Sequence, residues 1–238
     1  TPRSSSAASD VYKRQTQSST SRSAFNGVSV EYQVQLANEL GSNAWFNMPH
    51  QANDDYVRTF AEYVRDNIHD DAQVLVEYSN EVWNYAPGFE ANGWIGEQQD
   101  LPENEGLTFM DVWAQEARRD FAIWSEVFAG QEDRLTRVAA GQQNNPWLTN
   151  QLLARMNGEF DAVSSTSYSG LGTGNLDWMT ESTTQDEIID WVLENAVPWS
   201  LQTQAAHVEM AEAYSESLGR EIQFVTYEGC LLYTSDAA

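Results

Sequence analysis

The sequence predicts an α/β protein in which helices connect the strands of a parallel sheet. Short apolar runs rich in β-branched residues alternate with longer segments whose apolar residues recur every three or four positions. No charged linker separates these segments, which favours crossover connections within one domain. Each strand-like run also ends in a polar cluster, and a (β/α)8 barrel or an open α/β sheet displays its functional groups at such strand ends.

The predicted elements follow one another from residue 30 to residue 227. Predicted strands cover residues 44–50, 74–78, 135–140, 160–163 and 222–227, and predicted helices cover 30–40, 54–68, 108–128, 147–156, 186–194 and 201–218. Gly41 ends the first helix and Asp54 begins the second. The long Gly-, Pro- and Asn-rich connection over residues 84–107 is of a kind that is often functional. The glycine-dense stretch 170–174 is interpreted as a loop, because no helix starts directly after it to cradle a phosphate.

The composition limits the classes of partner. The chain has 36 acidic and 12 basic residues and a formal net charge of −24. Nucleic acid and anionic membrane are therefore not expected as partners, since their phosphates would repel this surface. The charge suits a neutral polysaccharide or a saline habitat, or it is simply a solvated acidic surface. Nine tryptophans supply core, and rings of this kind also serve as stacking platforms in sugar-binding clefts.

Cofactor and membrane signatures are absent from the pattern. A single cysteine, Cys230, permits no intrachain disulfide, and the three histidines show no metal-ligand spacing. No run approaches the roughly 18 apolar residues of a membrane-spanning helix. The sequence therefore predicts neither a metal nor an organic cofactor.

The stretch Val-Leu-Val-Glu-Tyr-Ser-Asn-Glu-Val-Trp-Asn at residues 74–84 is the most informative part of the chain. A strand-like run gives way abruptly to the polar residues Ser79, Asn80 and Glu81. A carboxylate that directly follows an apolar strand, between an amide and the indole of Trp83, suits a catalytic acid. The alternative is that Glu81 caps a helix and Trp83 belongs to the core. Glu77, inside the strand, is interpreted as structural or salt-bridged.

A second carboxylate, Glu228, follows the last predicted strand within Tyr-Glu-Gly, residues 227–229. Together with Asn80-Glu81 it resembles clan A of the retaining glycoside hydrolases, which are built on (β/α)8 barrels. In that clan the acid/base glutamate follows an asparagine at the end of the fourth strand, and the nucleophile ends the seventh. Counted on this pattern, the five predicted strands are strands 3 to 7 of a partial TIM barrel. More locally, the two motifs look like a bacterial subgroup labelled cellulase-like or cellulose-binding.

The resemblance covers about residues 27–229, and beyond it both ends look foreign. Residues 1–15 and 230–238 resemble translated sequencing-adapter read-through, and Cys230 stands where the family would favour another glycine. We therefore expect an internal fragment of an environmental gene. It would comprise a non-native or disordered segment 1–23, a partial TIM-barrel domain 24–229 and a non-native tail 230–238.

The resemblance implies a chemistry for the paired glutamates. Retaining hydrolysis uses two carboxyl groups about 5–5.5 Å apart. Glu228 would be the nucleophile, Glu81 the acid/base, and Asn80 a hydrogen-bond partner of the sugar hydroxyl next to the reacting carbon. The expected function is hydrolysis of a neutral β-linked polysaccharide or oligosaccharide. The alternative is a carbohydrate (cellulose)-binding barrel without catalysis.

Further candidates for substrate binding lie at the predicted strand ends, and each has a structural alternative. Tyr168 could orient Glu228 or be a rim tyrosine. His50 could contact sugar or position Glu81, or be a satisfied polar histidine. Trp83 and Trp178 could stack on sugars or pack in the core. Asn47 and Gln142 complete the set of expected substrate-binding residues. Export to the periplasm or medium is expected for the parent protein, whereas the sugar, the linkage and the oligomeric state do not follow from the sequence.

Overall fold

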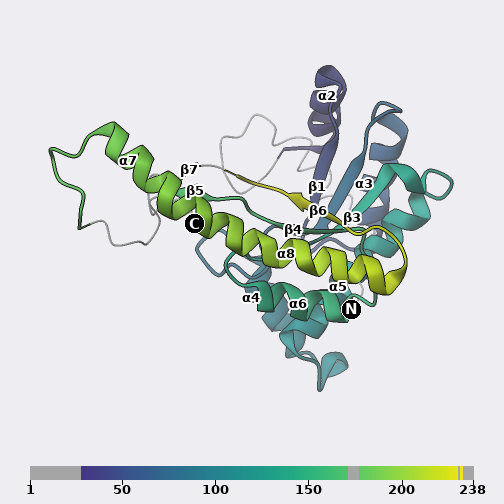
Figure 1. The fold of residues 1–238 in the computed structure, drawn as a ribbon. Helices are drawn as coiled ribbons and strands as arrows, with labels where there is room; N and C mark the ends of the chain where they lie inside the picture. The colour runs from purple at the N-terminus through teal and green to yellow at the C-terminus, as the bar shows by residue number, and fades with distance from the viewer. Residues whose placement is uncertain (1–27, 171–176, 230, 233–238) are drawn as a thin grey trace. The chain divides into compact units, whose positions relative to one another are not determined.

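In a computed structural model, the chain folds as an α/β protein whose helices and strands alternate (Figure 1). The structure describes residues 28–170, 177–229 and 231–232. Five strands form one sheet in the order β1-β2-β3-β4-β6, and the pairs β1–β2, β2–β3 and β4–β6 are parallel. They are β1 Ala44–Met48, β2 Val74–Tyr78, β3 Leu135–Ala140, β4 Ala162–Ser165 and β6 Gln223–Thr226. Their spatial order follows the chain, which confirms the predicted α/β class with a parallel sheet.

The helices also follow the predicted order. They are α2 Val30–Leu40, α3 Asp54–Asn67, α4 Ala91–Gln99, α5 Phe109–Val127, α6 Pro146–Arg155, α7 Gln185–Trp191 and α8 Val197–Leu218, with short 3-10 turns η2 Pro102–Asn104 and η3 Glu132–Arg134. The chain divides into two compact units, Thr1–Ala139 with Leu152–Asp161 and Ala140–Gln151 with Ala162–Ala238. No helix in the described ranges is long and apolar enough to cross a bilayer.

The first unit is built around a cluster of aromatic rings between β1 and two helices. The ring of Phe46 in β1 lies 5.5 Å from Phe60 of α3 and 6.2 Å from Trp124 of α5, centroid to centroid. Trp124 also stacks on Phe128 at 5.7 Å, and all four rings are buried. Burial of rings this large, at roughly 25 cal/mol per Å2 of apolar surface, is the main force that fixes these helices on the strands.

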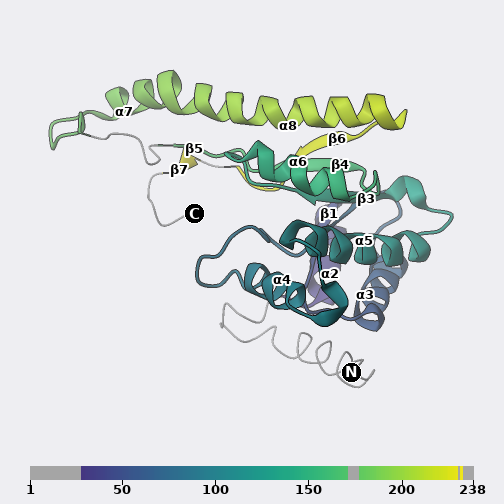
Figure 2. The ribbon, with the colours of Figure 1, turned by 90° about the horizontal axis from the view of Figure 1, so that it is seen from below.

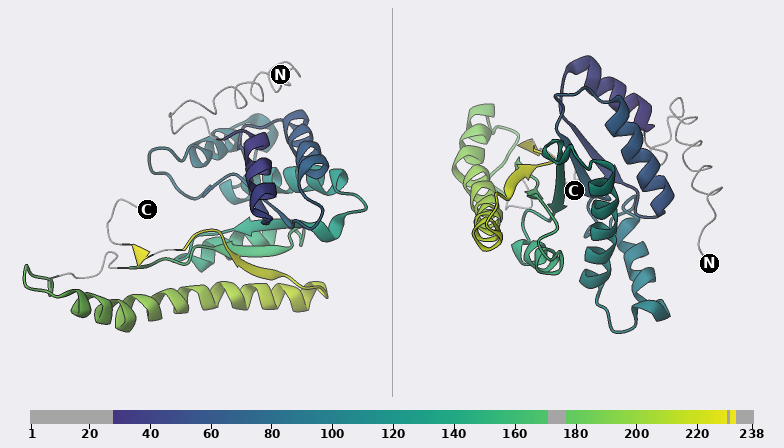
Figure 3. Two further views of the ribbon diagram at one scale, coloured as in Figure 1. Left: turned by 90° about the horizontal axis from the view of Figure 1, so that it is seen from above. Right: turned by 90° about the vertical axis from the view of Figure 1, so that its right-hand side faces the viewer.

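Local sequence explains where the helices of the first unit begin and end. Asn53 caps α3 by accepting a hydrogen bond from the Tyr56 amide at 3.0 Å, and Thr108 with Asp111 forms a capping box on α5. Gly41 closes α2 in the left-handed conformation (φ 59°), as expected for a glycine at this position. Helices α2 and α3 contact each other and lie side by side in Figure 3. The connection over residues 84–107 holds more structure than expected, because α4 and η2 form within it.

The second unit pairs β4 with β6 in parallel, Ala162 opposite Gln223, and α8 packs on both strands. The sequence predicts two separate helices over residues 186–218, and this is wrong. Helix α7 continues through a π-helical turn, Val192–Ala196, into α8, so the three segments form one rod (Figure 2). Pro198 does not interrupt the rod. It lies two residues after the π-helical turn, where the regular hydrogen bonding of an α-helix is already interrupted.

Several expectations fall on residues outside the described ranges: the N-terminal segment 1–23, most of the glycine-dense stretch 170–174, Cys230 and the tail from residue 233. Within the expected tail, Leu231–Leu232 forms the short strand β7. It pairs in parallel with β5, Ser169–Gly170.

Candidate active site

The loop that follows β2 has a strained backbone. Ser79 and Glu81 both adopt the left-handed conformation, with φ of 55° and 48°, and neither is a glycine. Such a conformation costs an L-residue about 1–2 kcal/mol, so the surrounding structure has to hold it. One support is the Ser79 amide, which donates to the Met48 carbonyl of β1 at 2.9 Å. The turn leaves Asn80 exposed and Glu81 half-buried just beyond the carboxyl end of the strand.

Glu81 is held by residues close to it in the sequence. The Asn84 side chain donates to Glu81 Oε2 at 2.8 Å, and the Asn84 backbone amide donates to the Glu81 carbonyl at 2.8 Å. Asn84 Oδ1 in turn accepts from the Ala86 amide at 2.9 Å, which closes the turn. The alternative that Glu81 caps a helix is wrong, since the next helix, α4, begins only at Ala91.

Glu77, the buried acid of β2, lies opposite Asn47 in the strand register and is only 4% exposed. The Trp45 indole N–H donates to Glu77 Oε2 at 3.1 Å. Burial raises the pKa of Glu77 to about 8, the Trp45 hydrogen bond opposes this shift and the Glu81 charge adds to it. Within the described ranges no basic side chain pairs with Glu77, so the salt-bridge interpretation is wrong. At neutral pH this carboxyl is largely a neutral acid.

His50 lies in the loop between β1 and α3, with its ring edge-to-face against Trp94 at 5.9 Å. Burial lowers the pKa of His50, and the Glu90 charge opposes this only in part, so the imidazole is neutral near pH 7. The interpretation as a satisfied polar histidine does not fit, because its Nε2 is buried and forms no hydrogen bond within the described residues. The remaining roles, contact with a sugar or support of Glu81, stay predictions.

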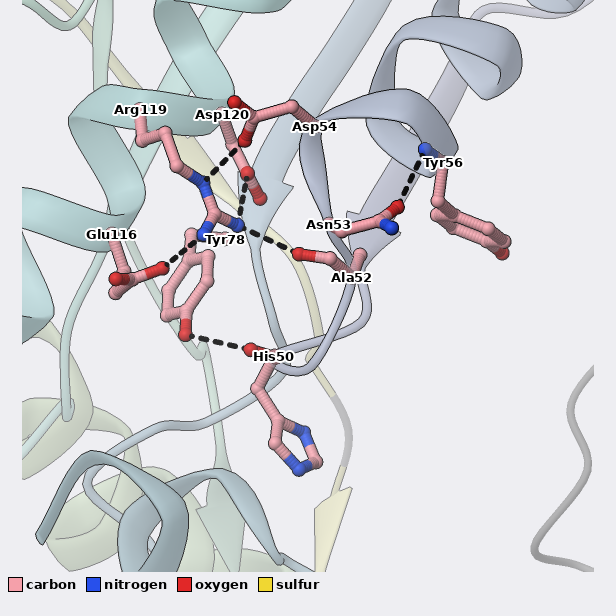
Figure 4. A network of polar contacts seen from close by, with 9 residues as sticks. All are labelled: His50, Ala52, Asn53, Asp54, Tyr56, Tyr78, Glu116, Arg119 and Asp120. Atoms are coloured by element: carbon pink, nitrogen blue, oxygen red, sulfur yellow. Dashed lines mark hydrogen bonds and ion pairs between the residues drawn. The ribbon is translucent and has the colours of Figure 1, made fainter. Parts of the chain in front are cut away.

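A network from β2 and α5 holds the backbone of the His50 loop (Figure 4). The Tyr78 hydroxyl donates to the His50 carbonyl at 3.2 Å, and the Arg119 guanidinium donates to the Ala52 carbonyl at 2.8 Å. Arg119 is shared among three carboxylates, Glu116 at 2.7 Å, Asp120 at 3.1 Å and Asp54 at 3.4 Å. Asp120 is fully buried, and burial, opposed by Arg119, raises its pKa to about 7. The sequence contained no signal for this network, because it joins three segments of the chain, 50–54, Tyr78 and 116–120, that are distant from one another.

In the second unit, the Tyr168 hydroxyl donates to Glu228 Oε2. Tyr168 follows β4 and is half-buried, whereas Glu228 follows β6 and is exposed. The Ser167 amide also donates to the Glu228 carbonyl at 2.7 Å. A Cβ on Gly229 would lie 3.1 Å from Ser167 Cβ, so this close approach of the two loops favours glycine after Glu228.

The loop after β3 contributes a residue that the sequence analysis missed. Gln142, the expected substrate-binding residue, is half-buried, and its side chain makes no hydrogen bond to the described residues. Its neighbour Gln143 is only 5% exposed and contacts Tyr168 and α8. Two adjacent glutamines carry the same local signal, and only the packing of the loop decides which one is buried.

The other expected site residues lie at or beyond the carboxyl ends of strands or in loops. Asn47 is exposed in β1, and its role stays a prediction. The Trp83 ring lies 6.1 Å from buried Trp113, and Trp178 stacks on Trp191 at 5.9 Å, so both indoles are at least partly engaged in packing. Among the described side chains, no group of three or more His, Cys, Asp or Glu residues is arranged to hold a metal ion.

No protein-family model and no curated protein sequence matches the chain. Among solved structures, it is similar to the GH51 arabinofuranosidase from Xanthomonas axonopodis pv. citri, with a TM-score of 0.56 and 17% identity over 84% of this chain. The chain spans 38% of the length of that enzyme. A β-glucuronidase from Bacteroides uniformis also matches, with a TM-score of 0.30 and 12% identity over 85% of this chain and 28% of that enzyme. The chain therefore shares part of the fold of a glycoside hydrolase.

Proposed function

We propose that this chain is part of a retaining glycoside hydrolase and contributes strands 3 to 7 of a (β/α)8 barrel. The observation that supports this best is the position of two glutamates. Glu81 follows the carboxyl end of β2, and Glu228 follows the carboxyl end of β6, three strands further along the sheet order. The fourth and seventh strands of clan A enzymes carry their two catalytic glutamates in this arrangement, as the sequence resemblance implies.

The proposed reaction has two steps, in which Glu228 forms and then loses a covalent bond to the sugar while Glu81 transfers protons. The Glu228 carboxylate attacks the anomeric carbon, the bond to the leaving oxygen breaks, and Glu81 gives its proton to that oxygen. Glu81 then takes a proton from water, whose oxygen displaces Glu228 from the anomeric carbon. This chemistry requires the two carboxyl groups about 5–5.5 Å apart across the sugar.

The groups around each glutamate suit these roles. Asn84 fixes one carboxyl oxygen of Glu81, and the strained turn sets the direction in which that side chain leaves the strand. Asn80 is exposed beside it, as a contact to a sugar hydroxyl requires. Tyr168 donates to the proposed nucleophile and restrains it. His50, Asn47, Trp83 and Gln142 would extend the sugar contacts.

For the substrate we propose a neutral β-linked polysaccharide or oligosaccharide, in keeping with the net charge of −24. The similar solved structure is an arabinofuranosidase, so arabinofuranosides belong among the substrates tested. We also propose that the parent protein acts outside the cytoplasm, where polymeric substrates of this kind are found.

A second candidate function, carbohydrate binding without catalysis, is favoured by two exposed aromatic rings. Tyr85, in the loop after β2, is 88% exposed, and Trp147, at the start of α6 after β3, is 67% exposed. Exposed rings near the carboxyl ends of strands offer apolar platforms to the faces of sugars whether or not chemistry follows.

The test uses the longest reading frame that contains this sequence and a panel of aryl β-glycosides, aryl arabinofuranosides and polysaccharides. Glu228→Ala and Glu81→Ala should each lower turnover by about three orders of magnitude or more. Azide or formate should restore activity to Glu228→Ala by replacing the missing carboxylate.

The control is Glu221→Ala, an exposed glutamate before the amino end of β6, which should retain full turnover. Unchanged activity in both active-site variants would overturn the assignment. Retained binding to cellulose with no turnover on any substrate would favour the binding barrel.

A further inference from the structure

We propose that Gln143 is a positioning residue that sets the direction of the Tyr168 hydroxyl toward Glu228. This deepens the proposed function and rests on it for one point only, that Glu228 reacts with substrate. Gln143 touches neither Glu228 nor, in this proposal, the sugar. It acts through Tyr168.

The side-chain amide of Gln143 hydrogen-bonds to both the backbone N–H and the backbone C=O of Tyr168. Gln143 Oε1 accepts from the Tyr168 backbone N–H at 3.0 Å, and Gln143 Nε2 donates to the Tyr168 carbonyl at 3.2 Å. One side chain thus pairs with the N–H and C=O of a single residue, as a neighbouring strand would. With both ends of its peptide fixed, Tyr168 has only its side-chain torsions left, and its hydroxyl meets Glu228 Oε2.

The same amide also bonds to α8 and to the segment that follows β4. Gln143 Nε2 lies 3.1 Å from Ser200 Oγ and 3.2 Å from Thr203 Oγ1, and Gln143 Oε1 accepts from Thr166 Oγ1 at 2.9 Å. Gln143 is 5% exposed, so loss of these bonds would leave buried polar groups without partners. Oxygens surround Nε2 and two donors meet Oε1, which explains why a side chain with both a donor and an acceptor fits here.

A buried contact between α6 and α8 holds the loop that carries Gln143. Thr149 Oγ1 lies 3.0 Å from His207 Nε2, and His207 Nδ1 lies 3.0 Å from the Thr203 carbonyl. Burial, opposed by backbone hydrogen bonds, lowers the pKa of His207, so the neutral ring donates from Nδ1 and accepts at Nε2. Thr149 leaves no room for a Cβ at residue 141, where it would lie 1.9 Å from Thr149 Oγ1. A residue without a Cβ, glycine, is therefore required at position 141, where the loop begins beside Thr149.

The first test measures turnover in the active protein. Gln143→Met should lower kcat by about 10- to 100-fold with little change in KM, because it removes an interaction that orients the reacting carboxylate rather than the substrate. Tyr168→Phe should have a similar effect, and the double variant should be no worse than the more impaired single variant. If kcat of the double variant falls by the product of the two single-variant effects, the two residues act independently and the proposal is wrong.

The second test does not depend on catalysis. Tyrosine ring signals are recorded by NMR on uniformly labelled protein, and the Tyr168 signal is assigned by its loss in Tyr168→Phe. Glu228→Gln should shift this signal in the parent protein and leave it unmoved in Gln143→Met. An equal shift in both backgrounds would show that Gln143 does not set the contact.

Two variants separate positioning from general damage. Gln204→Met removes a different bond to the same loop, from Gln204 Nε2 to the Thr166 carbonyl at 3.4 Å, and should leave the Tyr168 signal unchanged. Gln143→Glu keeps an acceptor and, when protonated, one donor. Its Tyr168 signal should approach that of the parent at low pH and depart from it as the buried acid ionises. If the protein hydrolyses no glycoside, the proposed function fails, while the NMR result still decides the role of Gln143.

Discussion

The two proposed catalytic glutamates are held in different ways. Glu81 sits in a strained turn and is bonded by Asn84, three residues further along the chain. Glu228 is bonded by Tyr168 and Ser167, which come about 60 residues earlier. The first carboxylate therefore has a hydrogen-bond partner in its own segment, and the second has its partners in another loop.

This difference has a consequence for what disturbs each residue. A short continuous stretch contributes to the geometry around Glu81, because Asn84, which donates to its carboxylate, lies within that stretch. The geometry around Glu228 depends on β4, β6 and α8 packing correctly. Damage to the second unit should therefore displace Glu228 and leave the environment of Glu81 intact.

The largest effect should come from Gly141→Ala in the second unit. The new Cβ would lie 1.9 Å from Thr149 Oγ1, and we expect the unfolding free energy of this unit to fall by about 3 kcal/mol or more. Hydrogen exchange followed by mass spectrometry should show faster exchange in α8 and β6 and unchanged exchange in β1 and β2. Gly93→Ala, in open space on α4, is the control and should be neutral or slightly stabilising. Equal loosening of both units by Gly141→Ala would contradict the comparison.

The next effect concerns pH and the buried neighbour of Glu81. The folded-state pKa of Glu77 is about 8, against an ordinary value of 4.5. Between these two pH values Glu77 is therefore mostly protonated in the folded state and mostly ionised in the unfolded chain. The unfolding free energy should therefore fall as pH rises through this window, by at most about 1.4 kcal/mol per pH unit. Asp120 adds a similar slope only up to about pH 7.

Urea unfolding between pH 7 and 8 thus isolates Glu77. In this interval Glu77→Gln should flatten the dependence, because it removes the titrating proton while retaining the acceptor for the Trp45 indole. A slope unchanged from that of the parent protein would mean that Glu77 is not buried as a neutral acid.

A smaller effect should come from the strained turn. Ser79→Val places a β-branched residue at φ 55° and should lower the unfolding free energy of the first unit by about 1–2 kcal/mol. Ser79→Gly is the matched variant and should change it by less than about 1 kcal/mol, since glycine accepts this conformation freely. Comparable losses in denaturant unfolding of the two variants would show that strain at this position is unimportant.

The smallest effect should come from Asn84→Ala. It removes the donor to Glu81 Oε2 and the acceptor for the Ala86 amide, and we expect a loss of about 1 kcal/mol in denaturant unfolding. Asn144→Ala, at an exposed position in the loop after β3, should change stability by less than about 0.5 kcal/mol. If the Asn144→Ala control loses as much unfolding free energy as Asn84→Ala, the two hydrogen bonds of Asn84 do not account for its contribution to stability.

Much of the fold could be predicted because its signals are local. The apolar stripe of α2 and the cap at Gly41, or the β-branched run of β2, need only near neighbours in the sequence. The continuity of α7 with α8 could not be predicted, because a π-helical turn joins the two helices and shifts the spacing of their residues around the helix axis. Gln143 was missed for a related reason: its hydrogen-bond partners lie 23 to 60 residues away, and the Ala52 carbonyl that Arg119 binds lies 67 residues away.

The sequence by itself determined the alternation of strands and helices and placed Glu81 and Glu228 directly after strands, since both depend on local periodicity and on abrupt changes of polarity. Tertiary structure alone decided that Glu77 is a neutral acid bonded to an indole, that Gln143 rather than Gln142 is buried, and that Tyr168 meets Glu228. The physical reason is that burial and hydrogen bonding depend on which distant segments exclude water from a group. Short-range sequence patterns do not show which segments these are.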